Sequence, residues 1–187
     1  MATIRGYMAM SVDGYIAAPG GGIDWLRAYD RVDFGAHAYD RFIRDVETLV
    51  MGRATYEAIV AMDEGWPYGG KRVIVVTSTP LADPAGALET WGAGLDALIA
   101  QLRGRTDGDV WLVGGGRLQQ AFIAAGALDR LELFIVPEIV GGGHQTFPPN
   151  GFARHVRLAA AVTFAAGVVC LDYRFDPLTP PAGAGGP

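Results

Sequence analysis

The sequence predicts a three-layer α/β domain with a mainly parallel sheet of about eight strands that ends in an antiparallel hairpin. Over most of the chain, short apolar segments rich in β-branched residues alternate with single segments of helical periodicity. One helix between two strands is typical of a crossover connection, which joins parallel strands. The last two apolar segments have no helix between them, and they therefore predict an antiparallel pair at the edge of the sheet.

In the first third of the chain, residues 3–11 are apolar and β-leaning, which predicts the first strand. A glycine-rich loop follows at 20–22, and apolar residues at helical spacing predict a helix over 33–44. A short apolar run at 48–51 predicts the next strand. It leads directly into a predicted helix over 54–62.

The same reasoning applies to the rest of the chain. Density of β-branched and aromatic residues predicts strands at 72–77, 88–91, 109–113, 131–136, 156–164 and 168–175. Helical spacing of apolar residues predicts helices at 95–102 and 118–125. We assign residues 1–175 to one domain and residues 176–187, which are rich in Pro and Gly, to a disordered tail.

Composition excludes several classes of protein. Half of the 187 residues are hydrophobic and 10% are aromatic, which excludes a disordered chain. A net charge of −5 argues against nucleic acid or an anionic membrane as a partner. A single cysteine, Cys170, excludes an intrachain disulfide, and the three histidines lack metal-ligand spacing, so no metal site is predicted. No transmembrane or signal segment is evident, which predicts a cytoplasmic protein.

The segment 113–118 (VGGGRL) places three consecutive glycines where a predicted strand turns into a helix. Glycines there let a ligand approach the backbone, and the start of the helix offers free N–H groups to a phosphate. A tight turn without a ligand is the alternative interpretation. Because three glycines exceed what a turn requires, we favour an anion site.

Two further strand ends carry groups that suit phosphate. The segment 51–57 (MGRATYE) repeats the order strand, glycine turn, helix, and a bound phosphate would relieve the conflict between Arg53 and the helix dipole. A solvent-exposed Arg53 is the alternative. The segment 76–80 (VTSTP) places three hydroxyls at the end of another strand. Since ligands bind beyond the carboxyl ends of strands in such sheets, the three ends together predict a dinucleotide with an extra phosphate.

These motifs, in this order, resemble those of the dihydrofolate reductase-like superfamily, which includes the C-terminal reductase domain of the bifunctional riboflavin-biosynthesis protein. The resemblance covers residues 2–175 and includes the segment 10–17 (MSVDGYIA), whose Asp-Gly pair is also typical of a hairpin or turn. The segment 135–143 (IVPEIVGGG) is similar to the P-x-x-x-G-x-G pattern of the riboflavin branch. The fold implied is the dihydrofolate reductase-like fold.

The resemblance implies an NADPH-binding reductase and assigns a role to each matching position. The residues implied to bind the adenosine 2′-phosphate and the pyrophosphate are Arg53, Thr55, Thr77 and Ser78. Those implied to bind the pyrophosphate and nicotinamide side are Val113, Gly114, Gly115, Gly116, Arg117 and Leu118. The loop near the nicotinamide supplies Gly14 and Ile16 to the cofactor and Asp13 and Trp25 to the substrate. Asp30 and Asp33 are both candidates for the catalytic carboxylate.

The implied reaction is NADPH-dependent hydride transfer to a pteridine- or pyrimidine-type substrate, as in 5-amino-6-(5-phosphoribosylamino)uracil reductases. Dihydrofolate reductase activity proper is one alternative. A non-catalytic module for nucleotide binding or dimerisation is another, with strand 131–136 and the terminal pair as its interface. The expected partners are a small-molecule substrate and a second copy of the chain, with no nucleic acid and no membrane.

Overall fold

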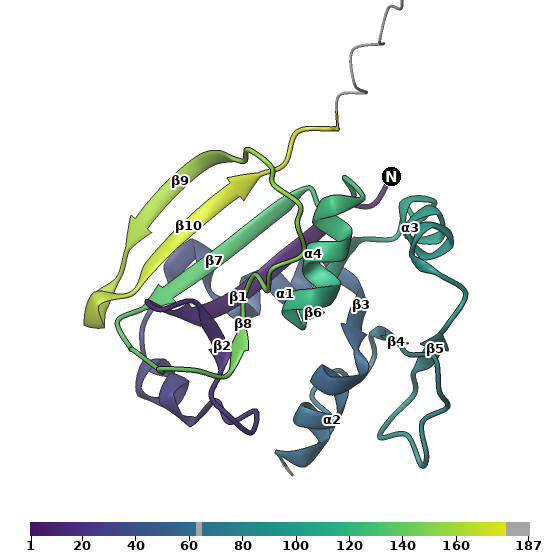
Figure 1. Cartoon of the computed structure of the whole chain (residues 1–187), viewed down its shortest axis with the longest axis horizontal. Coiled ribbons are helices and arrows are strands. Elements are labelled where there is room, and N and C mark those ends of the chain that lie inside the picture. Colours follow the sequence, from purple (N-terminus) through teal and green to yellow (C-terminus); the bar gives the residue numbers. More distant parts are fainter. Residues whose placement is uncertain (63–64, 179–187) are drawn as a thin grey trace, which may run out of the picture.

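One eight-stranded sheet forms the centre of the computed structural model, which describes residues 1–62 and 65–178 (Figure 1). Its strands are β1 (Ile4–Ser11), β3 (Val46–Gly52), β4 (Arg72–Val76), β5 (Glu89–Trp91), β6 (Asp109–Gly114), β7 (Arg130–Val136), β9 (Arg157–Thr163) and β10 (Val169–Arg174). The α-helices are α1 (Tyr39–Asp45), α2 (Arg53–Ala61), α3 (Leu95–Arg103) and α4 (Gly116–Ala124). Two short strands, β2 (Tyr15–Ala17) and β8 (His144–Gln145), pair separately.

The strand order in the sheet is β5-β4-β3-β6-β1-β7-β10-β9. All neighbours from β5 to β7 are parallel, whereas β10 runs antiparallel to both β7 and β9. The predicted α/β sheet with an antiparallel C-terminal hairpin is therefore confirmed. Residues 179–187 of the predicted tail lie outside the described residues, and the domain limits stay a prediction.

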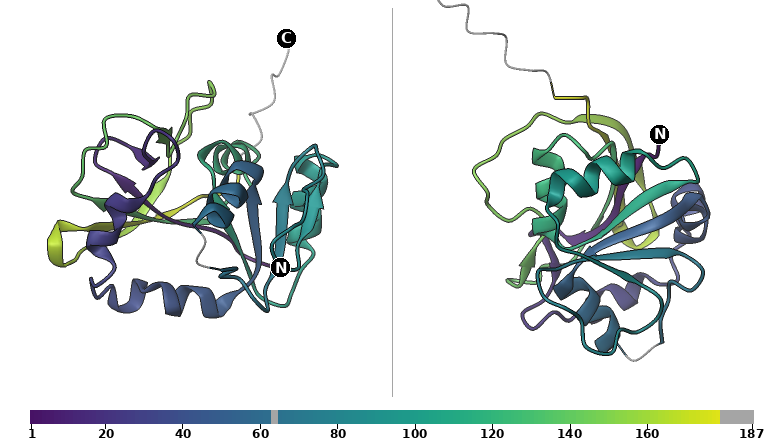
Figure 2. Two further views of the ribbon diagram at one scale, coloured as in Figure 1. Left: turned by 90° about the horizontal axis from the view of Figure 1, so that it is seen from below. Right: turned by 90° about the vertical axis from the view of Figure 1, so that its right-hand side faces the viewer.

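Helices cover both faces of the sheet, as the views in Figure 2 show. On one face, Leu98 of α3 and Phe122 of α4 pack on Ile4 and Leu112. On the other face, α1 and α2 pack on a second cluster that includes Met51 and Trp111. The side chains of a strand alternate between its two faces, and β1 therefore contributes side chains to both clusters. This arrangement is the predicted three-layer architecture.

The predicted helix over 33–44 is wrong in its first half. Residues Gly35–His37 form a 3-10 turn, and the α-helix begins only at Tyr39. The Asp33 carboxylate accepts a hydrogen bond of 2.8 Å from the Gly35 N–H, and Gly35 has φ +52°. Asp commonly forms such local turns in competition with a helix, and helical spacing of apolar residues does not reveal them.

One of the two parts of the interface suggested for a dimerisation module is wrong. Strand 131–136 forms β7, which is an interior strand. It lies between β1 and β10, and most of its side chains are buried. The apolar run 131–136 therefore serves the core of the domain. The edge strand on this side of the sheet is β9, of which Leu158 is half exposed. The homodimer itself stays a prediction.

Charged side chains are buried on one face of β1, β7 and β10. The Arg5 guanidinium donates to Asp109 at 2.9 Å and to Glu132 at 3.0 Å. Arg130 forms a two-pronged pair with Asp172 at 2.9 and 3.0 Å, and its Nη2 lies 3.2 Å from Glu132. Because each buried charge has an opposite partner, the network avoids the cost of an isolated ion.

Among the described residues, no helix has the length and apolar character needed to cross a membrane.

Candidate functional site

The carboxyl ends of β4, β3 and β6 lie side by side at one edge of the sheet (Figure 1). Helix α2 begins at Arg53 directly after β3, and α4 begins at Gly116 after β6. The turn that starts with Thr77 follows β4. The fold thus brings together the three segments in which the sequence suggested phosphate-binding groups.

A cleft of about 1480 Å³ opens at this edge. The site residues proposed from the sequence that line it are Ile16, Asp30, Arg53, Thr55, Val113, Gly114, Gly115, Gly116, Arg117 and Leu118. Those outside its lining are Asp13, Gly14, Trp25, Asp33, Thr77 and Ser78. The cleft therefore gathers the glycine turn and the start of α2, while much of the β1–β2 loop lies outside.

Two helices present their N-termini to the cleft without side-chain caps. The N-cap residues are Gly52 for α2 and Gly115 for α4, and neither helix has a capping hydrogen bond from a side chain. The first N–H groups of a helix lack partners within the helix, and its dipole favours negative charge there. Two such ends in one cleft suit an anionic ligand.

The glycine turn packs closely on both of its sides. A Cβ added at Gly114 or Gly115 would lie 3.5 or 3.4 Å from Thr55 Oγ1, and the peptide between these glycines is cis. A Cβ added at Gly116 would lie 2.6 Å from the Thr146 carbonyl oxygen. Packing alone thus explains Gly116, whereas Gly115 leaves its cleft side open to a ligand.

Arg53 links α2 to the turn after β4. Its Nε donates to Glu57 Oε1 at 2.7 Å, and its Nη1 donates to Thr79 Oγ1 at 2.5 Å. Within the described part of the chain, Nη2 makes no hydrogen bond, and the side chain is 39% exposed. The guanidinium is therefore held in place with donors left for a ligand.

The hydroxyls after β4 are arranged differently from the expectation. Thr77 Oγ1 donates to the Thr79 carbonyl at 3.0 Å and accepts from the Thr79 N–H at 3.2 Å, which closes a local turn. Ser78 is exposed beside it. Thr79, which the sequence analysis did not assign, is the residue that contacts Arg53. A binding role for Thr77 and Ser78 stays a prediction.

The Asp13 carboxylate connects the turn after β1 to the segment 140–141 through hydrogen bonds. It accepts hydrogen bonds from Ser11 Oγ at 2.6 Å and from the N–H groups of Val140 and Gly141 at 3.1 and 2.7 Å. The Gly14 carbonyl accepts from Thr146 N and Oγ1 at 2.9 and 3.0 Å. The turn predicted at this Asp-Gly pair is confirmed, but β2 pairs with β8 and not with β1. Contact of Asp13 or Gly14 with a ligand stays a prediction.

The Ser11 hydroxyl, with the N–H groups of Gly141 and Val140, holds the pKa of Asp13 below its ordinary value of 3.8. A lowered pKa in the folded state stabilises the fold above the unfolded pKa, and the gain is lost as the pH falls through the folded pKa. We therefore expect Asp13→Asn to lower the melting temperature at neutral pH and to differ less from the wild type below pH 3.8. Thermal unfolding at a series of pH values measures this; a constant difference would contradict it.

The two candidate catalytic carboxylates, Asp30 and Asp33, lie in different places relative to the cleft. Asp30 is exposed and lines the cleft, whereas Asp33 lies outside it and closes the local turn to Gly35. Trp25 packs in the apolar cluster under the Asp24–Tyr29 turn, with Phe134 nearby, and lies outside the cleft lining. Of these residues, Asp30 is the one that a cleft ligand could reach.

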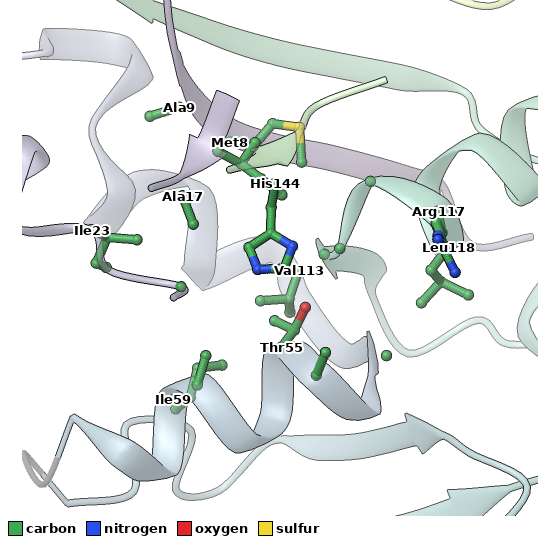
Figure 3. A pocket seen from close by; sticks show the side chains of 18 of the residues that line it. Met8, Ala9, Ala17, Ile23, Thr55, Ile59, Val113, Arg117, Leu118 and His144 are labelled. Carbon is green, nitrogen blue, oxygen red and sulfur yellow. The ribbon is translucent and has the colours of Figure 1, made fainter. Parts of the chain in front are cut away.

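His144 is a cleft residue that the sequence analysis missed. Figure 3 shows its imidazole between Met8 and Val113, facing Thr55, with Leu118 to one side. It follows the glycines 141–143, and this position after the fourth motif was the available signal. A lone histidine carries no spacing pattern in the sequence. Its place in the cleft depends on β8, which packs on the glycine turn. Among the described residues, no cluster of acidic, His or Cys side chains could hold a metal ion.

A family model described as the RibD C-terminal domain matches residues 2–170. The chain belongs to the RibD C-terminal domain family. Together with the fold, this membership relates it to proteins of riboflavin biosynthesis.

The chain is also similar to two bacterial proteins by sequence and to two solved structures. The chain is 29% identical over 162 residues to the uncharacterized protein YwjB of Bacillus subtilis, covering 87% of this chain and 92% of that one. It is 22% identical to the uncharacterized protein YyaP of the same organism, covering 90% and 93%. A crystal structure from Shewanella sp. PV-4, named for riboflavin biosynthesis, gives a TM-score of 0.81 at 26% identity and covers 94% and 99%.

Dihydrofolate reductase from Enterococcus faecalis, solved in complex with NADP(H), gives a TM-score of 0.64 at 18% identity and covers 92% and 95%. This likeness shows the fold alone. The dihydrofolate reductase-like fold expected from the sequence is confirmed.

Proposed function

We propose that this protein is an NADPH-dependent reductase that transfers a hydride to a pteridine- or pyrimidine-type substrate. The observation that supports it most is the junction of three adjacent strand ends, which surrounds one cleft with two uncapped helix N-termini and Arg53. Such a junction in an open α/β sheet is where nucleotide ligands bind. Membership of the RibD C-terminal domain family supports the reductase class.

The groups in the cleft fit this cofactor. The N-termini of α2 and α4 would hold the pyrophosphate, with Thr55 beside them. The free Nη2 of Arg53 would bind the 2′-phosphate, because a guanidinium suits phosphate oxygens. When bound, NADPH supplies the hydride, and the protein orients the reacting groups and excludes water.

The size of the cleft also supports two ligands bound together. Its volume of about 1480 Å³ exceeds the roughly 300–1,000 Å³ typical of a site for one small molecule. The substrate half would lie between the Asp24–Tyr29 turn and α2, where Leu26 and Ile59 form apolar walls. Asp30 and His144 each line the cleft, with a carboxylate and an imidazole that can hold or move a proton.

Replacing Arg53 by Ala should weaken NADPH binding by roughly 1–3 kcal/mol and leave NADH binding nearly unchanged, because only NADPH carries the 2′-phosphate. Arg44→Ala is a matched control, since Arg44 is an exposed arginine outside the cleft. Titration of both variants with both cofactors measures the effect. Equal losses for NADPH and NADH would remove the 2′-phosphate role from Arg53.

The reaction itself is tested by following NADPH oxidation against a panel of pterins and flavin precursors. Turnover of a pyrimidine or pterin, abolished by omitting either reactant, is the expected result. Firm NADPH binding without turnover of any compound would favour the non-catalytic nucleotide-binding alternative. Turnover of dihydrofolate above all others would favour dihydrofolate reductase activity proper.

A further inference from the structure

A side pocket of about 430 Å³ opens from the cleft between the glycine loop 20–22 and the last turn of α2. Of the residues assigned to the cofactor, all lie outside its lining. Its volume is many times the roughly 30 Å³ that one water molecule takes up, so a ligand side chain of several carbon atoms fits. The residues that line both the cleft and the side pocket include Ile23, Leu26, Asp30, Ala58 and Met62.

Helix α2 runs from the cofactor end of the cleft to this side pocket. Arg53 is its first residue and Ala61 its last, and their separation of eight residues corresponds to about 12 Å along the helix axis. Figure 3 shows Thr55 facing His144 and Ile59 one turn further along the helix. A helix dipole is positive at its N-terminus and negative at its C-terminus. The helix that favours an anion at the cofactor end therefore disfavours one at the side pocket.

The charged side chains of the side pocket act in the same direction. Its described lining contains two carboxylates, Asp24 and Asp30, and one guanidinium, Arg27, which gives a net formal charge of −1. Arg27 Nε donates to Asp24 Oδ1 at 3.1 Å and is engaged, whereas the Asp30 carboxylate accepts no hydrogen bond within residues 1–62 and 65–178. The other two arginines of the described cleft, Arg53 and Arg117, lie in the first turns of α2 and α4. A phosphate in the side pocket would therefore meet negative charge on two of its walls.

We propose that the side pocket binds an uncharged, hydroxyl-bearing side chain of the substrate and excludes a phosphate. Hydroxyl groups donate to carboxylate oxygens, which Asp30 supplies, while Leu26 and Ala58 offer apolar surface to the carbon chain. The inference rests on the proposed function only in identifying this ligand with the substrate of the reductase. The substrate class is then an unphosphorylated heterocycle, in contrast to the phosphoribosyl compound that the resemblance implies.

Neopterin and its 3′-monophosphate test this inference, because they differ only in a phosphate on a three-carbon, hydroxylated side chain. Each is titrated calorimetrically into the full chain, first without cofactor and then with saturating NADP⁺. The NADP⁺ occupies the helix N-termini, to which a phosphate would otherwise bind. With NADP⁺ present, wild type should bind neopterin about tenfold more tightly than the monophosphate, because the carboxylates and the end of α2 repel the phosphate.

Ala61→Lys adds an ammonium group to the wall of the side pocket. It should strengthen binding of the monophosphate about tenfold and leave neopterin binding unchanged. Val60→Lys is the matched control, since Val60 is the preceding residue of α2, is 43% exposed and lies outside the lining of both spaces. A lysine suits the C-terminal end of a helix, so both variants should fold, and thermal unfolding checks this.

Absence of neopterin binding, or monophosphate binding by wild type that is as tight as neopterin binding with NADP⁺ present, would overturn the inference. The same response of Ala61→Lys and Val60→Lys would also overturn it, because the phosphate would then lie outside the side pocket. Failure of NADP⁺ to bind would instead contradict the proposed function. The comparison of Ala61→Lys with Val60→Lys on the chain without cofactor would still test the side pocket in that case.

Discussion

Glu132→Ala is expected to lower the free energy of unfolding by about 3–5 kcal/mol, the usual cost of breaking a buried ion pair from one side. The Glu132 side chain is 4% exposed and contacts three partners: Arg5 at 3.0 Å, Arg130 at 3.2 Å and His37 Nδ1 at 2.8 Å. Removing the carboxylate leaves Arg5 with Asp109 and leaves Arg130 with Asp172. Each arginine keeps one carboxylate, and the loss of stability comes from the buried contacts of Arg5, Arg130 and His37 that Glu132 no longer supplies.

Glu89→Ala is the matched control for this change. Glu89 also forms a two-pronged pair with an arginine, Arg72, at 2.6 Å for both contacts, but its side chain is 51% exposed. An exposed pair contributes about 0–1 kcal/mol, so this variant should lose far less stability. Urea unfolding of both variants measures the difference. Similar losses in the two would show that burial does not govern the network around Glu132.

Gly116→Ala is expected to have the second large effect, because it disturbs the site and the fold together. An added Cβ would lie 2.6 Å from the Thr146 carbonyl oxygen, closer still to that of Gln145, and 3.0 Å from Pro148 Cδ. Overpacking of this kind costs typically about 1–3 kcal/mol. Since His144 and Gln145 form β8 beside the cleft, the displaced backbone should also weaken NADPH binding.

Gly69→Ala serves as its control, since a Cβ at Gly69 meets no atom within 4 Å and its φ is not positive. Thermal unfolding and NADPH titration of both variants separate the effects. We expect Gly69→Ala to match the wild type in both measurements. A Gly116→Ala variant with unchanged stability and unchanged binding would contradict the close packing of β8 on the glycine turn.

The sequence predicted the sheet well because strand identity depends on local apolar density. That Arg53 and Gly115 lie close together could be predicted in two steps. Single helices between strands indicate parallel strands, and the carboxyl ends of parallel strands lie at the same end of the sheet. Contacts that depend on backbone returning from far along the chain could not be predicted. The approach of β8 to Gly116 and the place of His144 are of this kind.

Local hydrogen bonds and side-chain direction account for the remaining differences. Asp33 was a plausible catalytic carboxylate by position, yet it caps a turn that interrupts the expected helix.

In the function proposed here, the cleft binds NADPH through the N-termini of α2 and α4 and through Arg53. Titration of the wild-type protein with NADPH and with NADH, followed by tryptophan fluorescence, tests it most directly, because Trp111 lines the cleft. We expect micromolar binding of NADPH and much weaker binding of NADH. Failure of both cofactors to bind would contradict it and would mean that the glycine turn serves packing alone.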